Sequence, residues 1–131
     1  MATLITVADE TATGTTLNEF PLEFLNERVS VRELIRARIY QEVAEYNARQ
    51  SEYFRGLVQP EGAERTQGGF RLRQQRKIDW EEQYKRALRG FRANGFLILV
   101  DDRQLDDLDE EIELRYDARV SFLKLVPLVG G

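Results

Sequence analysis

The sequence has 131 residues, of which 42% are hydrophobic and 32% are charged, values typical of one compact domain. It contains neither cysteine nor histidine, which excludes thiol nucleophiles, histidine general bases, Cys/His zinc sites and disulfides. The formal net charge of -4 argues against nucleic acid as the main partner, because nucleic-acid-binding domains usually carry net positive charge.

The N-terminal residues are predicted to form a β-hairpin. Thr3–Val7 and Leu17–Leu25 have the length and composition of strands, and the Gly/Thr-rich segment Ala8–Thr16 between them is predicted to be the connection. Pro21 lies inside the second run, and proline has no N–H to donate to a neighbouring strand. The second strand is therefore expected at an edge of the sheet or at a local irregularity.

A long helix is predicted to begin after Ser30. Ser30 and Glu33 have the spacing of a capping box, in which the serine side chain caps the first turn. Apolar residues then recur at helical spacing, and Tyr53, Phe54 and Leu57 extend the stripe, so the helix is predicted to end near Leu57. The main stripe consists of Val31, Leu34, Ile35, Ile39, Val43 and Tyr46.

Residues 58–94 are predicted to contain a surface loop followed by a second helix. Proline, glycine and polar residues concentrate at 58–75. Asp79 and Glu82 suit the N-terminal cap of the helix, and Asn94–Gly95 suits its C-terminal stop. The apolar face of this helix consists of Trp80, Tyr84, Ala87, Leu88 and Phe91.

The loop before this helix is basic. Its cations are Arg65, Arg71, Arg73, Arg76 and Lys77. We expect them to lie on a plain exposed loop. The alternatives are contact with nucleic acid, with a protein partner, or with the acidic loop of another copy.

Three strands are predicted in the last third of the chain. Phe96–Val100 is continuously apolar, which favours a strand covered on both faces, and Arg103–Leu105 is a candidate short strand after a turn. Val120–Val126 is the predicted last strand. It can lie parallel to the first strand, between the hairpin and Phe96–Val100, because the helices provide the long crossover that parallel neighbours require.

The segment around the short strand is strongly acidic. Its carboxylates belong to Asp101, Asp102, Asp106, Asp107, Asp109, Glu110, Glu111 and Glu113. We interpret it as a solvated loop that keeps the protein soluble, and the alternative is that it steers a basic surface of a partner. No metal site is predicted, because the segment lacks the glycine-centred loop and ligand spacing of a calcium site.

No segment is predicted to enter a membrane. The longest wholly apolar run, Phe96–Val100, is too short to span a bilayer. The N-terminus lacks a basic segment ahead of an apolar one, as a secretion signal would have. We therefore expect a cytoplasmic protein without a membrane partner.

The sequence ends in a diglycine directly after the predicted last strand. Gly130 and Gly131 form a thin tip that takes nearly any backbone conformation, so they can enter a narrow enzyme channel. The five residues Pro127–Gly131 span roughly 17 Å when extended, which is enough to reach a buried cleft. Pro127 is expected to end the strand, and Leu128 and Val129 to lie in the cleft with it.

These features resemble the ubiquitin-like β-grasp family, in the order of elements, in Asp102–Asp107 after the third strand, and in a last strand that leads into Gly-Gly. The resemblance covers residues 1–57 and 95–131 and departs from the family at 58–94, where a loop and a second helix replace a short connection. It implies an α+β fold in which a mixed sheet wraps a long helix. It also implies one domain, 1–131, with a flexible tail at 127–131.

Within the family, the length and architecture most resemble bacterial ubiquitin-like proteins encoded beside activating, conjugating and deconjugating enzymes, some in antiviral operons. The resemblance implies that the chain is no enzyme and needs no cofactor. Gly131 would be adenylated by an activating enzyme that uses ATP, passed as a thioester to a conjugating enzyme and joined to a target protein by an isopeptide bond, which a deconjugating protease reverses. The alternatives are a sulfur carrier that forms a thiocarboxylate at Gly131 for cofactor biosynthesis, and an unconjugated interaction module.

The resemblance also suggests a partner surface on the last strand. Phe122, Lys124 and Val126 share one face of the predicted strand, from which the Lys124 ammonium is expected to extend into solvent. An apolar outer face of the sheet would then be a docking patch. The alternative is that the second helix covers that face.

Overall fold

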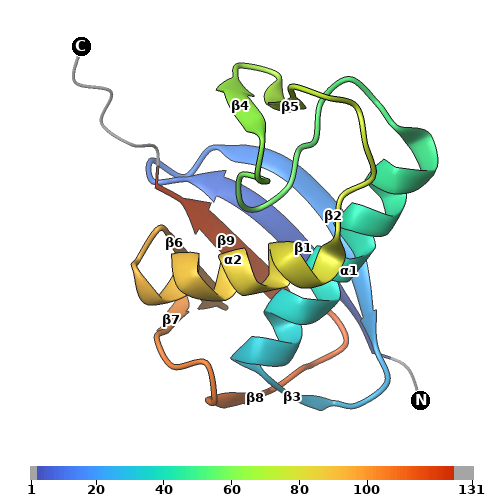
Figure 1. Ribbon diagram of the computed structural model, residues 1–131. Coiled ribbons are helices and arrows are strands. Elements are labelled where there is room, and N and C mark those ends of the chain that lie inside the picture. The colour runs from blue at the N-terminus through green and yellow to red at the C-terminus, as the bar shows by residue number, and fades with distance from the viewer. Residues whose placement is uncertain (1–2, 126–131) are drawn as a thin grey trace. The chain divides into compact units, whose positions relative to one another are not determined.

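The computed structural model describes residues 3–125 (Figure 1). These residues fall into two compact units. Residues 3–34 and 91–125 form the first, called the sheet unit, and residues 35–90 form the second, called the 35–90 unit. The fold class is mixed α+β, as predicted, because the described chain contains two helices and a five-stranded mixed sheet. Neither described helix is long and apolar enough to cross a membrane.

The strands of the main sheet are β1 (Thr3–Thr11), β2 (Thr16–Phe24), β6 (Phe96–Val100), β7 (Arg103–Leu105) and β9 (Arg119–Lys124). Their order is β2-β1-β9-β6-β7, with β9 in the centre, parallel to β1 and antiparallel to β6 (Figure 1). This confirms the predicted position of the last strand. β2 is an end strand, which confirms the edge position predicted from Pro21.

The hairpin of β1 and β2 has a shorter turn than predicted. The strands extend into Ala8–Thr16 from both sides and leave only residues 12–15 for the connection. The Thr11 hydroxyl accepts a hydrogen bond from the Thr15 backbone N–H at 3.1 Å, and Gly14 has a φ of 91°, which glycine adopts without strain. The prediction was wrong about length because threonine suits a strand as well as a turn.

β6 alternates between buried and partly exposed side chains. Phe96 and Ile98 are 3% and 0% exposed, whereas Leu97 and Leu99 are partly exposed. The prediction that both faces of this strand are covered is therefore wrong. All five residues of the strand are apolar, but only the face with Phe96 and Ile98 lies in the core. Apolar composition on both faces therefore did not mean burial of both faces.

A two-stranded ribbon in the sheet unit was not predicted from the sequence. β3 (Arg28–Ser30) pairs antiparallel with β8 (Glu111–Glu113). Val29 and Ile112 lie directly opposite each other and are 2% and 6% exposed. Each strand has one apolar residue between charged or polar ones, too short a pattern to recognise in the sequence.

The first helix, α1 (Val31–Arg49), begins where the capping box predicts. The Glu33 backbone N–H donates a hydrogen bond to Ser30 Oγ at 3.1 Å, which satisfies one of the free donors of the first turn. The predicted apolar stripe as far as Tyr46 is buried. The helical spacing thus identified the buried face correctly.

The predicted continuation of this helix to Leu57 is wrong. Gln50 has a positive φ of 47°, and its backbone N–H bonds to the Tyr46 carbonyl at 2.6 Å. A left-handed residue with such a bond closes the last turn of a helix. Phe54 and Leu57 are buried all the same, at 2% and 6% exposure, from the chain that follows the helix.

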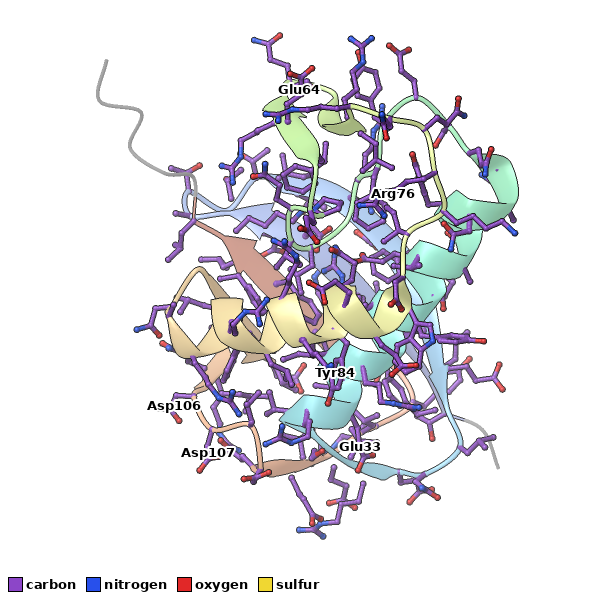
Figure 2. All side chains as sticks on the ribbon, viewed as in Figure 1. Glu33, Glu64, Arg76, Tyr84, Asp106 and Asp107 are labelled. Atoms are coloured by element: carbon purple, nitrogen blue, oxygen red, sulfur yellow. The ribbon has the colours of Figure 1, made fainter. Side chains whose placement is uncertain are left out.

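The predicted surface loop at 58–75 contains a hairpin. β4 (Ala63–Thr66) and β5 (Gly69–Leu72) pair antiparallel, and Glu64 marks β4 in Figure 2. Phe70 of β5 also exchanges backbone hydrogen bonds with Phe54 at 2.7 and 2.9 Å. Gly68 and Gly69, two of the glycines that suggested an irregular loop, lie at the turn of this hairpin.

The second helix, α2 (Trp80–Arg92), lies where it was predicted. Asp79 Oδ1 accepts a hydrogen bond from the Glu81 backbone N–H at 3.0 Å, and Asn94 has a positive φ of 58° after the last turn. The buried face is rotated from the predicted one. Gln83 is 1% exposed, whereas Tyr84 is partly exposed.

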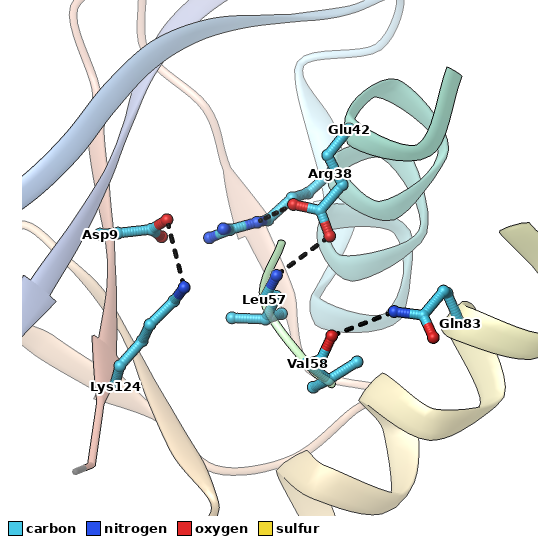
Figure 3. Close-up of polar contacts among 7 residues, drawn as sticks. All are labelled: Asp9, Arg38, Glu42, Leu57, Val58, Gln83 and Lys124. Carbon is cyan, nitrogen blue, oxygen red and sulfur yellow. Dashed lines mark hydrogen bonds and ion pairs between the residues drawn. The ribbon is translucent and has the colours of Figure 1, made fainter. Parts of the chain in front are cut away.

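Buried polar contacts fix the chain that follows α1 within the 35–90 unit (Figure 3). Arg38 is 0% exposed and donates from Nε to Glu42 Oε2 at 3.2 Å. Glu42 Oε1 accepts from the Leu57 backbone N–H at 3.1 Å, and Gln83 Nε2 donates to the Val58 carbonyl at 3.1 Å. Residues of α1 and α2 thereby satisfy backbone groups that lack a partner strand.

Candidate functional site

The candidate site lies at the end of β9 in the sheet unit. The sequence assigns residues beyond this strand to the partner surface, to the tail and to conjugation: Val126, Pro127, Leu128, Val129, Gly130 and Gly131. All six lie outside the described residues. The described part of the site is therefore β9 itself with its neighbours β1 and β6.

Phe122 of β9 faces the core. Its side chain is 1% exposed, and its ring packs on Phe96 with the ring centroids 6.1 Å apart. The prediction that Phe122 forms part of a partner surface is therefore wrong, because a partner has no access to it.

Lys124 lies on the same side of β9 and pairs with a buried carboxylate. Its Nζ is 3.9 Å from Asp9 Oδ2 of β1, and the side chains of Lys124 and Asp9 are 29% and 2% exposed (Figure 3). The ammonium therefore points to Asp9, whereas the sequence predicted a free surface lysine. A sequence pattern that shows only apolar neighbours does not reveal such a partner on another strand.

The opposite face of the sheet carries an apolar patch. Leu123 of β9 pairs directly with Leu97 of β6, and Leu99 of β6 pairs with Ser121. Leu97, Leu99 and Leu123 are all partly exposed, and we call them the leucine patch. A shift of one residue along a strand moves a side chain to the other face, so these leucines lie on the face of the sheet opposite to Phe122 and Lys124. Arg119 and Ser121, two polar residues that alternate with the buried Val120 and Phe122, are the sequence signal for the outer face.

An ion cluster joins three strands beside the leucine patch. Arg119 of β9 lies 3.2 Å from a carboxylate oxygen of Glu10 on β1 and 3.4 Å from one of Glu19 on β2. Glu10 is also the cross-strand neighbour of Leu123. The hydrogen bond to Glu10, supported by the charge of Glu19, raises the pKa of Arg119 above its ordinary value. The patch therefore has a charged rim held in place by the sheet.

Arginines neutralise part of the acidic segment. Its ion pairs within the sheet unit include Arg28 with Glu111 at 3.1 Å, Arg32 with Asp109 at 3.3 Å, and Arg103 with Glu110. Asp106 and Asp107 lie on the loop between β7 and β8 (Figure 2). Among residues 3–125, no group of three or more His, Cys, Asp or Glu side chains is placed to hold a metal ion.

Comparison with known proteins gives no relative. No protein-family model matches the sequence, and neither curated proteins nor solved structures give a match. The function is therefore inferred from the geometry of β9 and its neighbours.

Proposed function

We propose that the chain is a ubiquitin-like protein modifier with a β-grasp fold, whose Gly131 carboxylate is joined to amines of target proteins. The observation that carries the proposal is the strand order of the main sheet, with β9 parallel to β1 in its centre. That is the order expected from the β-grasp resemblance. Because β9 is hydrogen-bonded on both sides, it gives the segment that leads to Gly131 a rigid base.

The chemistry proceeds by acyl transfer on partner proteins. A carboxylate oxygen of Gly131 attacks the α-phosphorus of ATP and displaces pyrophosphate, which gives an acyl adenylate. A cysteine thiolate of a partner attacks the acyl carbon and AMP leaves. A lysine amine of the target then attacks the thioester, loses a proton and releases the thiol. The chain has no cysteine, so the thiol nucleophiles that these reactions require belong to partner proteins.

The leucine patch is the proposed docking surface for the activating enzyme. The centre of a protein interface is typically poor in charge and its rim is polar, which matches three leucines beside the Arg119 cluster. Leu123 belongs to the strand that leads to the tail. A partner bound to the patch would therefore hold Gly131 near its own catalytic cleft.

The test is mass spectrometry of cells that carry the native gene neighbourhood, with N-terminally tagged wild type compared with a Gly131 deletion. Lys124 is the last tryptic site in the sequence, so a conjugated lysine should carry the branched remnant Leu125–Gly131. That remnant in wild type alone would support a modifier and identify its targets.

Two other results would contradict the proposal. An intact mass with one oxygen exchanged for sulfur at Gly131, without protein adducts, would indicate a sulfur carrier. An unchanged mass in the presence of active partner enzymes would leave an unconjugated interaction module.

A further inference from the structure

The two units carry charge of opposite sign. Seven Lys and Arg stand against fifteen Asp and Glu in the sheet unit, whereas twelve stand against eight in the 35–90 unit, giving net charges of -8 and +4. The excess of positive charge is concentrated at 65–77, which contains five cations and no carboxylate. The chain thus contains a basic segment at 65–77 although its net charge is negative.

This segment belongs to the β4–β5 hairpin and the chain after it, residues 63–77, which we call the basic arm. The exposed cations of the arm are Arg65, Arg71, Arg73, Arg76 and Lys77. None of them forms an ion pair with a described residue, although Arg71 lies opposite Glu64 in the ladder. Their charges are therefore not neutralised within the described chain.

The arm is held in a defined shape although it is exposed. The Arg76 guanidinium donates to the backbone carbonyls of Glu61 and Lys77 at 2.6 and 3.1 Å, and Arg73 N–H donates to the Gly62 carbonyl at 3.0 Å (Figure 2 shows Arg76). These bonds to neutral acceptors position Arg76 and leave its charge free to attract an anion.

An aromatic ring lies among the cations. Phe70 is partly exposed, and the Arg65 guanidinium carbon lies 5.8 Å from its ring centroid. The backbone of Phe70 is anchored to Phe54, which is 2% exposed. The arm therefore presents an arginine and an aromatic side chain together on a fixed backbone.

We propose that the basic arm binds single-stranded nucleic acid. Guanidinium groups recognise phosphate by paired hydrogen bonds, and aromatic and arginine side chains provide stacking surfaces for unpaired bases. An acidic protein partner would be attracted by the positive charges alone. The pair formed by Arg65 and the partly exposed Phe70 is better explained by a partner with unpaired bases. This activity is independent of Gly131.

The experiment measures fluorescence anisotropy of a labelled single strand of about 16 nucleotides, as RNA and as DNA, between about 50 and 200 mM salt. The arm variant combines Arg65→Gln, Arg71→Gln and Arg73→Gln. The matched control combines Arg49→Gln, Arg89→Gln and Arg92→Gln, which are also exposed and form no ion pair with a described residue. Both variants lower the net charge equally.

The arm variant is expected to lose about tenfold or more in affinity and to lower the slope of log affinity against log salt by about 2, because each lost phosphate contact contributes about 0.7. The control should match wild type. Phe70→Leu, which keeps an apolar side chain, should weaken binding about fivefold or more through lost stacking.

Several outcomes would overturn the proposal. Equal losses in the arm variant and the control would show a general charge effect. Heparin binding as tight as that of the oligonucleotide and unaffected by Phe70→Leu would indicate a generic polyanion site. Absence of oligonucleotide binding, with self-association in sedimentation that only the arm variant loses, would show that the arm contacts a second copy of this chain.

Discussion

The Lys124 ammonium lies 3.9 Å from the Asp9 carboxylate, on the core-facing side of the paired strands β9 and β1. The Asp9 side chain is 2% exposed, so its charge has little access to water. A carboxylate with so little access to water is costly to leave without its cation. The end of β9 is thus fixed by electrostatics as well as by the ladder.

Lys124→Met should lower the free energy of unfolding by about 1 kcal/mol, because the apolar part of the side chain is kept while Asp9 loses a cation. Asp9→Asn should lower it as well. In the double variant the two losses should overlap by about 0.5 kcal/mol or more, as measured by urea denaturation. Losses that simply add would show that the two side chains do not interact.

Truncation of two adjacent residues of β9 should lower the free energy of unfolding by different amounts. Phe122→Ala should cost about 3–5 kcal/mol, because it leaves a cavity beside Phe96 in the core. Leu123→Ala, on the partly exposed face, should cost about 1 kcal/mol or less. Thermal unfolding of both variants gives the comparison, and a greater loss for Leu123→Ala would show that the two faces are assigned incorrectly.

The leucine patch should be required for activation but not for folding. Leu97→Ser together with Leu123→Ser should reduce formation of the activating-enzyme thioester about tenfold or more, because the apolar area buried in the proposed interface is lost. Circular dichroism should show an unchanged fold. Leu4→Ser with Leu17→Ser, at two exposed leucines of β1 and β2, is the control and should leave thioester formation unchanged. Equal thioester formation by wild type, the patch variant and the control variant would show that the docking surface lies elsewhere.

Gly56 should not tolerate a side chain. A Cβ at this position would lie 2.2 Å from the Phe54 ring and 2.9 Å from Glu42 Oε1, and both side chains are held by other contacts. Gly56→Ala should therefore cost about 3 kcal/mol in the free energy of unfolding. Gly14→Ala, which has open space but a φ of 91°, should cost about 1 kcal/mol. A smaller loss at Gly56 than at Gly14 would contradict the packing described for the 35–90 unit.

Elements with a strong local signal could be predicted from the sequence. The capping residues Ser30 and Asp79 mark both helix starts, and Phe96–Val100 is bounded by turn residues, so its limits were predicted residue by residue. The end of α1 was missed because apolar residues continue at helical spacing to Leu57, whereas the helix ends at Arg49 and Gln50 takes a left-handed backbone conformation.

Other features depend on contacts that no local pattern contains. Val29 and Ile112 pair across more than half of the chain, so β3 and β8 have no signal of their own. The faces of β9 were assigned incorrectly because Phe122 and Leu123 are both apolar, and the prediction did not use the polar residues Arg119 and Ser121 that mark the outer face. Gly131 and the rest of the predicted tail lie outside the described residues, and their role stays a prediction.

The pairing of β1 with β9 has a consequence for synthesis on the ribosome. β1 is made first and β9 last, so the sheet unit cannot be completed until residues near Lys124 have left the exit tunnel. Until then the β1–β2 hairpin has an unpaired inner edge, where another nascent chain can add a strand. All of the 35–90 unit emerges earlier. A chain truncated before β9 would lack the central strand of the main sheet and also Gly131, so incomplete products could not take part in the proposed conjugation.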